Sequence, residues 1–164
     1  MGSGKSSLGL RLAAELGWKF VDMDELIEAE CGMKVSEIFV LRGEEFFRAK
    51  EREVLHALAQ QRETVVATGG GVPVHGDNME TINAAGFSVY LQMSPAQLMQ
   101  RLKGERDKRP LIKGMDDGQL LEYIQKTLPE RELYYRKAHL TIDCDGVGYE
   151  YLINHIKNYL EHKR

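Results

Sequence analysis

The chain has 164 residues, of which 43% are hydrophobic and 29% are charged, and its formal net charge is −3. This length suits one domain with a sizeable core, and the absence of a basic excess argues against a nucleic-acid-binding protein. The sequence contains no run of about 18 apolar residues and no signal- or transit-peptide pattern, so we expect a cytoplasmic monomer that does not bind membranes.

The chain starts with a phosphate-binding motif. Residues 1–7 are MGSGKSS, which matches the second half of the pattern G-x-x-x-x-G-K-[ST]. In this pattern backbone N–H groups surround phosphate oxygens, the lysine contacts the β- and γ-phosphates, and the hydroxyl ligates Mg²⁺. A helix predicted over residues 7–16 adds the positive end of its dipole. We therefore expect ATP and Mg²⁺ as cofactors, with the nucleotide bound by Gly2, Ser3, Gly4, Lys5, Ser6 and Ser7.

The first glycine of the motif and the buried strand that normally precedes it would lie before Met1. Restoring that strand would give a sheet of five strands. One explanation is that an internal methionine has been taken as the start, and the other is that the protein lacks the strand. We favour the first explanation, which an intact-mass measurement of the natively expressed protein can test.

The remaining elements alternate between helices and strands. Helices are predicted over residues 7–16, 25–31, 44–60, 77–85, 95–102, 117–128 and 149–161, and strands over 18–21, 64–68, 87–91 and 139–142. This order predicts an α/β three-layer fold with a parallel sheet. Pro129 is expected to kink or break the chain before Arg131. The charged segment 104–118 is the least core-like part of the chain and is typical of a lid.

Candidate ligand-binding residues follow the predicted strands. Asp22 and Asp24 come after the strand at 18–21, where ligands bind in open parallel sheets, although Asp22 could also cap the next helix. Gly69, Gly70 and Gly71 follow the strand at 64–68, and close approach of their backbone to a ligand is favoured over a flexible turn. Arg48 and Glu51, by contrast, have the i, i+3 spacing of an ordinary surface ion pair.

Taken together, six segments resemble those of shikimate kinases in their order and spacing: GSGKSS, VDMDELIE, RGEEFFRAKE, VVATGGG, KRPLI and RELYYRKA. They span residues 2–138. The resemblance implies a single P-loop kinase domain over 1–164, with a substrate-binding insert at about 24–55 and a lid at about 104–118. It also implies ATP-dependent phosphorylation of the 3-hydroxyl of shikimate.

The resemblance assigns a role to individual residues. Lys5, Asp24 and Arg109 would be catalytic, with Asp24 as the base and Arg109 as the lid arginine. Ser6 and Asp22 would support the metal, and Arg101 would stack near adenine. The residues that would bind shikimate are Asp24, Arg48, Gly69, Gly70, Gly71 and Arg131, with the two arginines on its carboxylate.

These roles agree with the chemistry of phosphoryl transfer, which depends on positioning and on positive charge around the moving group. An alcohol acceptor also needs a nearby base, and two arginines favour an anionic acceptor over a neutral sugar. The chain departs from the family at Asp143 and Asp145, where many relatives carry an arginine near adenine. A gluconate or nucleotide kinase of the same fold, or a truncated ATP-binding domain without turnover, remains the alternative.

Overall fold

The computed structural model describes residues 2–106 and 109–162. Within these ranges the helices are α1 (Lys5–Leu16), α2 (Met23–Cys31), α3 (Val35–Leu58), α4 (Asn78–Ala85), α5 (Pro95–Lys103), α6 (Asp117–Tyr135) and α7 (Tyr149–Glu161). The strands are β1 (Lys19–Asp22), β2 (Thr64–Ala67), β3 (Val89–Gln92) and β4 (Leu140–Asp143), and two short 3₁₀ turns are η1 (Val72–Val74) and η3 (Pro110–Ile112). None of the described helices has the length and apolarity needed to cross a bilayer.

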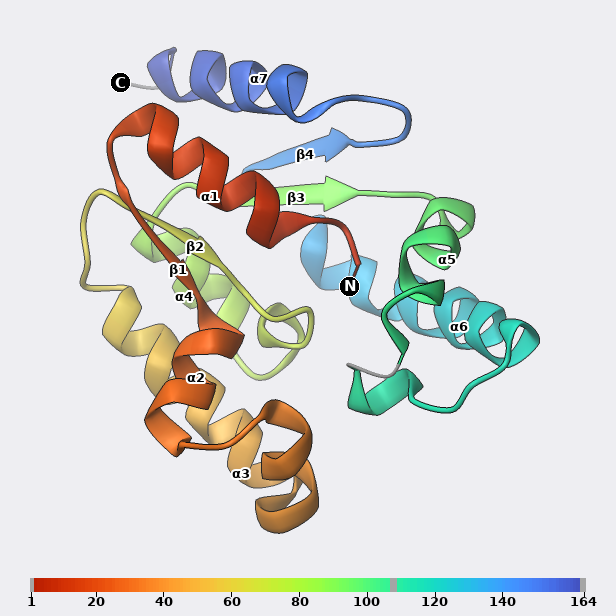
Figure 1. The fold of residues 1–164 in the computed structure, drawn as a ribbon. Helices are drawn as coiled ribbons and strands as arrows, with labels where there is room; N and C mark the ends of the chain where they lie inside the picture. Colours follow the sequence, from red (N-terminus) through yellow and green to blue (C-terminus); the bar gives the residue numbers. More distant parts are fainter. Residues whose placement is uncertain (1, 107–108, 163–164) are drawn as a thin grey trace.

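The strands form two parallel pairs, in which β1 pairs with β2 and β3 pairs with β4. Helix α1 packs against β1, β2 and α7, whereas α6 packs against α5 and η1 (Figure 1). The predicted α/β architecture with parallel strands is confirmed. The described strands do not join into one sheet, however, because β2 and β3 are not hydrogen-bonded to each other.

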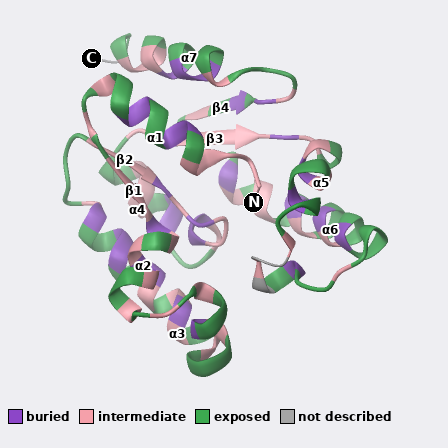
Figure 2. Ribbon diagram, in the orientation of Figure 1, coloured by how far each residue is buried: buried purple, intermediate pink, exposed green. Residues whose placement is uncertain are grey.

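Apolar side chains form two separate cores, and β2 contributes to both, with Val65 packed against one and Val66 against the other. One core joins α1, α5, α6 and α7 around Leu102 and Ile124, both of which are fully buried. The other core joins α2, α3 and η1 around Met23, Ile27 and Ile38 (Figure 2). Burial of one such side chain contributes about 1.5–3 kcal/mol, so these residues contribute strongly to the packing of the helices in each core.

Two helices differ from the sequence prediction. The helix predicted over 44–60 is the second part of α3, which begins at Val35 and is kinked at Gly43, where φ is 82° and ψ is 168°. The predicted break at Pro129 is wrong, because α6 continues through this proline to Tyr135. Proline removes one helical hydrogen bond, but buried Ile124, Leu128 and Tyr135 anchor the helix on both sides of it. Arg131 and Tyr135 therefore belong to one continuous helix.

Candidate functional site

The loop before α1 has the geometry of a phosphate-binding loop. Gly4 is the N-cap of α1 and has a φ of 80°, so the helix begins at Lys5 with its N–H groups directed at the loop. A Cβ at Gly4 would lie 2.8 Å from Nη1 of Arg101 and 3.0 Å from the hydroxyl of Tyr149. Only glycine fits this position, and Arg101 lies beside the loop.

Ser6 and Asp22 are brought together at the start of α1 and the end of β1. The Ser6 hydroxyl donates to Asp22 Oδ2 at 2.5 Å, while Asp22 Oδ1 accepts the Asp24 N–H at 3.0 Å and so caps α2. Oxygen donors of this kind fit Mg²⁺, which binds through one or two protein side chains together with phosphates and water. No cluster of three or more acidic, histidine or cysteine ligands occurs in residues 2–106 and 109–162, so a metal cage made only of protein is not present there.

Asp24, at the start of α2, faces positive charge from two directions. Burial raises the pKa of its carboxyl group, and the charge of Asp22 acts in the same direction. The charges of Lys5 and Arg109 lower this pKa and oppose the effect of burial. Two of the residues predicted to be catalytic, Lys5 and Arg109, therefore lie within electrostatic reach of the third, Asp24.

Two of the three consecutive glycines after β2, Gly69 and Gly71, lie against different polar side chains of the site. A Cβ at Gly69 would lie 2.9 Å from Asp24 Oδ1 and 3.2 Å from Glu51 Oε1. A Cβ at Gly71 would clash with the Arg48 guanidinium. The loop follows the C-terminal end of a parallel strand, where such folds bind ligands, and it packs against the polar side chains directly because it carries no side chains of its own.

Arg48 is held in place by two carboxylates on α3. Its guanidinium donates to Glu51 Oε2 at 2.6 Å and to Glu44 Oε1 at 3.0 and 3.1 Å. The expected surface ion pair is wrong in this respect, because the Glu51 side chain is only 2% exposed. Burial raises the pKa of Glu51, and hydrogen bonding and charge from Arg48 oppose that rise. The pair thus presents a fixed positive group at the edge of the glycine loop.

Arg131 on α6 and Arg48 on α3 both affect the pKa of the same histidine, His75. Burial lowers the pKa of His75, and the positive charges of Arg48 and of Arg131 lower it further. Both arginines therefore lie near the histidine that follows η1. No functional role was predicted for Glu51, His75 or Tyr135. The i, i+3 spacing of Arg48 and Glu51 within the predicted helix 44–60 could have indicated that Glu51 supports Arg48, whereas Tyr135 lies beyond the predicted helix 117–128 and had no such signal.

Arg109 is placed differently from the other site arginines. It donates to Glu105 Oε2 at 2.6 and 3.0 Å, and this partner lies within the same predicted lid segment, 104–118. The side chains of Arg109 and Glu105 are 37% and 47% exposed. Residues 107 and 108 of the segment lie outside the described residues. The segment thus carries its own counter-ion for the arginine.

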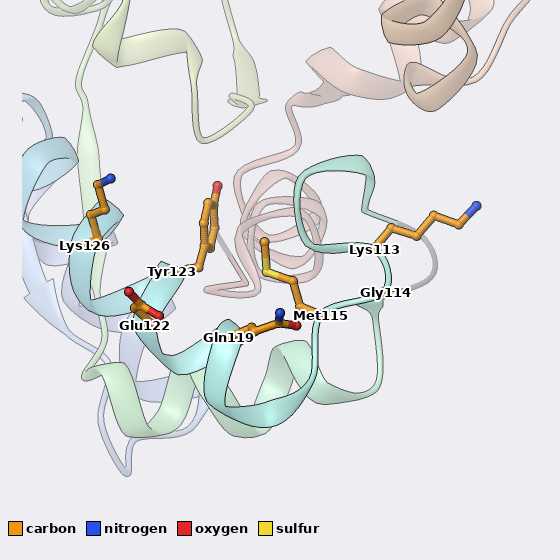
Figure 3. Close-up of a pocket in the computed structure, with 7 residues that line it drawn as sticks. All are labelled: Lys113, Gly114, Met115, Gln119, Glu122, Tyr123 and Lys126. Carbon is orange, nitrogen blue, oxygen red and sulfur yellow. The ribbon is translucent and has the colours of Figure 1, made fainter.

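A pocket of about 480 Å³ lies where the predicted lid meets α6 (Figure 3). Tyr123 and Met115 point into this space, with the amide of Gln119 below them. The side chains of Lys113 and Lys126 extend away from it, so their amino groups do not converge. The pocket therefore does not provide a convergent pair of lysines for an anion.

The acids that depart from the family pattern, at the end of β4 and just after it, accept backbone hydrogen bonds. Asp145 Oδ1 accepts the Ser94 N–H at 3.1 Å, and Asp143 Oδ1 accepts the Asp145 N–H at 2.9 Å. Burial raises the pKa of the intervening Cys144 to about 11, and the charge of Arg101 opposes this rise. Arg101 thus lies near both the phosphate-binding loop and residues 143–145.

A parallel α/β fold with a GSGKSS loop at the start of its first helix, facing paired carboxylates and arginines, defines a P-loop small-molecule kinase. A family model described as shikimate kinase matches residues 1–161. The chain belongs to the shikimate kinase family.

Individual relatives agree with this family. The chain is 40% identical over 160 residues to a shikimate kinase of Parabacteroides distasonis, a match that covers 98% of this chain and 92% of the relative. The crystal structure of a shikimate kinase from Bacteroides thetaiotaomicron superposes with a TM-score of 0.91 at 35% identity, covering 98% of this chain and 94% of that one. A structure of the Acinetobacter baumannii enzyme in complex with shikimate also gives a TM-score of 0.91, at 33% identity, covering 100% and 90% of the two chains.

Proposed function

We propose that this protein transfers the γ-phosphoryl group of ATP to the 3-hydroxyl of shikimate and releases ADP and shikimate 3-phosphate. The observation that carries the proposal is the placement of Asp24 and Arg48 around one glycine loop, with the charge of Lys5 acting on Asp24. The family and the shikimate complex of the Acinetobacter baumannii relative support shikimate as the acceptor.

The acceptor carboxylate binds to Arg48 and Arg131. Guanidinium groups are always charged and offer parallel donors, which matches the geometry of a carboxylate. Arg48 is preorganised because Glu44 and Glu51 already orient its guanidinium. Gly69, Gly70 and Gly71 contribute backbone N–H groups, and Asp24 accepts hydrogen bonds from the ring hydroxyls.

Asp24 is the base for the transfer step. Its carboxylate takes the proton of the 3-hydroxyl as that oxygen bonds to the γ-phosphorus, while the bond from the γ-phosphorus to its bridging oxygen breaks and ADP leaves. A raised pKa makes this carboxylate a stronger base than an ordinary aspartate.

Lys5 and Arg109 stabilise the charge that spreads over the phosphoryl oxygens during transfer. Mg²⁺, held through Ser6 and supported by Asp22, neutralises charge on the β- and γ-phosphates when it is bound. Gly2, Ser3, Gly4 and Ser7 surround the phosphates, and Arg101 stacks near adenine. Segment 104–118 closes as a lid and excludes water, which would otherwise accept the phosphoryl group.

The proposed enzyme is a cytoplasmic monomer with one kinase domain over residues 1–164. Its substrate-binding insert lies at about 24–55. The cytoplasm supplies the ATP that the reaction needs. An ADP-release assay with shikimate, gluconate and nucleoside monophosphates in parallel tests the function. We expect turnover with shikimate only, and turnover with another acceptor in its place would reject the proposal.

A further inference from the structure

The hydroxyl of Tyr135 connects α6 to the glycine loop across 65 residues of sequence. It donates to the carbonyl oxygen of Gly70 at 2.5 Å. Tyr135 is the last residue of α6 and follows Arg131 by four positions, which is about one helical turn. The same helical turn therefore carries a proposed ligand of the acceptor carboxylate and a hydrogen bond to the loop that surrounds the acceptor.

The ring of Tyr135 is fixed on the side away from the loop. Only 9% of Tyr135 is exposed, and its ring centroid lies 5.1 Å from that of Tyr90 on β3. Tyr90 in turn donates to Glu132 Oε1 on α6 at 2.8 Å. The ring is thus held between a strand and its own helix, so the hydroxyl reaches the loop from a rigid support.

The hydrogen bond fixes more than one oxygen atom. The peptide between Gly70 and Gly71 is planar and trans, so holding the Gly70 carbonyl also sets the direction of the Gly71 N–H. The backbone dihedral angles of glycine are less restricted than those of any other residue. A loop of three glycines therefore needs contacts from outside the loop to keep one conformation. Asp24, Glu51 and Arg48 pack against the two outer glycines, Gly69 and Gly71, and Tyr135 holds the middle one.

We propose that Tyr135 is a positioning residue for the acceptor: it holds the Gly69–Gly71 loop in register with Arg131, so that the carboxylate ligands and the backbone N–H groups meet the acceptor together. The residue does not touch the acceptor itself. This inference rests on the proposed function, because it concerns the binding of shikimate at that site.

The test is Tyr135→Phe, which keeps the ring and its packing and removes only the hydroxyl. The KM for shikimate is expected to rise about tenfold, which corresponds to the loss of one buried hydrogen bond with its acceptor left unpaired. The KM for ATP is expected to change less than about twofold, because the donor loop has its own supports at Arg101 and Tyr149.

Tyr90→Phe is the matched control, since it makes the same change in the neighbouring ring, whose hydroxyl bonds to Glu132 and not to the loop. It keeps the ring that packs against Tyr135, so the KM for shikimate should rise much less than in Tyr135→Phe. A double-mutant cycle with Arg131→Ala provides a second readout. If Tyr135 aligns the loop with Arg131, removing its hydroxyl should raise the KM much less once Arg131 is absent.

Melting curves of each variant separate positioning from general destabilisation. An unchanged KM for shikimate in Tyr135→Phe, additive effects in the cycle, or a lowered melting temperature with equal increases in both KM values would each overturn the inference. If the unmodified protein does not phosphorylate shikimate, the proposed function fails instead. Calorimetric titration of shikimate into the two Phe variants then tests the positioning role without turnover, and equal affinities would reject it.

Discussion

The acceptor side and the donor side of the site hold their arginines in opposite ways. Arg48 is bound by two carboxylates, and its side chain is 17% exposed, while that of Glu51 is 2% exposed. Arg109 is bound by a single exposed glutamate of its own segment. One guanidinium is therefore fixed by a buried network before any ligand binds, whereas the other can exchange its partner at little cost.

This difference suggests separate tasks for the two arginines: Arg48 binds the acceptor, and Arg109 moves with the lid segment. A fixed arginine loses little conformational entropy when it binds a carboxylate, which favours selective binding of a small anionic acceptor. An exposed arginine on a polar segment can leave Glu105 and move to phosphate oxygens when ATP binds. Asp24 lies between the two sides, because the charges of Lys5 and Arg109 act on it and its Oδ1 lies against Gly69 of the glycine loop.

Replacement of Asp24 should give the largest effect on turnover, since this residue serves both sides. Asp24→Asn keeps the shape of the side chain but removes the base, so kcat is expected to fall by about 10²- to 10⁴-fold. The KM for shikimate should change much less, because an amide can still accept hydrogen bonds from hydroxyls. Steady-state kinetics measures both values, and a raised KM with an unchanged kcat would exclude Asp24 as the base.

Arg48→Ala should weaken both acceptor binding and the stability of the fold. The KM for shikimate is expected to rise about 30- to 100-fold, because one partner of the carboxylate is lost. The free energy of unfolding should also fall by about 3 kcal/mol, because Glu51 is left buried without its counter-ion. Urea denaturation measures the second effect.

The double variant Arg48→Ala with Glu51→Gln is the control for this interpretation. A neutral amide is less costly to bury alone than a carboxylate, so part of the lost stability should return. The KM for shikimate should stay high. Recovery of neither stability nor binding would contradict a burial penalty at Glu51.

Arg109→Ala should show the opposite behaviour to Arg48→Ala. We expect kcat to fall about tenfold, as one charge-assisted hydrogen bond to the phosphoryl group is lost. The free energy of unfolding should change by less than about 0.5 kcal/mol, because the pair with Glu105 is exposed. A large loss of stability would show that Arg109 is as firmly held as Arg48 and would remove the contrast between the two sides.

The sequence predicted elements with local signals and missed the supports that depend on packing. The helix predicted over 149–161 has the same bounds in the structure, and the strand predicted over 64–68 is β2, which ends one residue earlier. The burial of Glu51 and the reach of Tyr135 to Gly70 depend on how α3 and α6 pack against the glycine loop, which spacing alone does not determine. Pro129 was misjudged for the same reason, since buried residues before and after it keep α6 continuous.

The smallest of the expected effects is the change of activity with pH near neutrality. Burial raises the pKa of Asp24, so acidification protonates the base. The value of kcat/KM should therefore fall as the pH drops through this raised pKa, at a higher pH than for an ordinary aspartate.

The same raised pKa predicts how stability changes with pH, because the folded protein binds this proton more tightly than the unfolded chain does. The resulting stabilisation is complete below the unfolded pKa and is lost as the pH rises through the folded pKa. Asp24→Asn should therefore melt at a higher temperature than the unmodified protein at neutral pH, and the difference should close on acidification. Glu51 also has a raised pKa, and the charge of Asp24 contributes to that rise, so the comparison reports the titration of these two coupled carboxyl groups together. A melting temperature for Asp24→Asn that is lower at neutral pH would mean that the ionised carboxylate stabilises the fold, contrary to its burial.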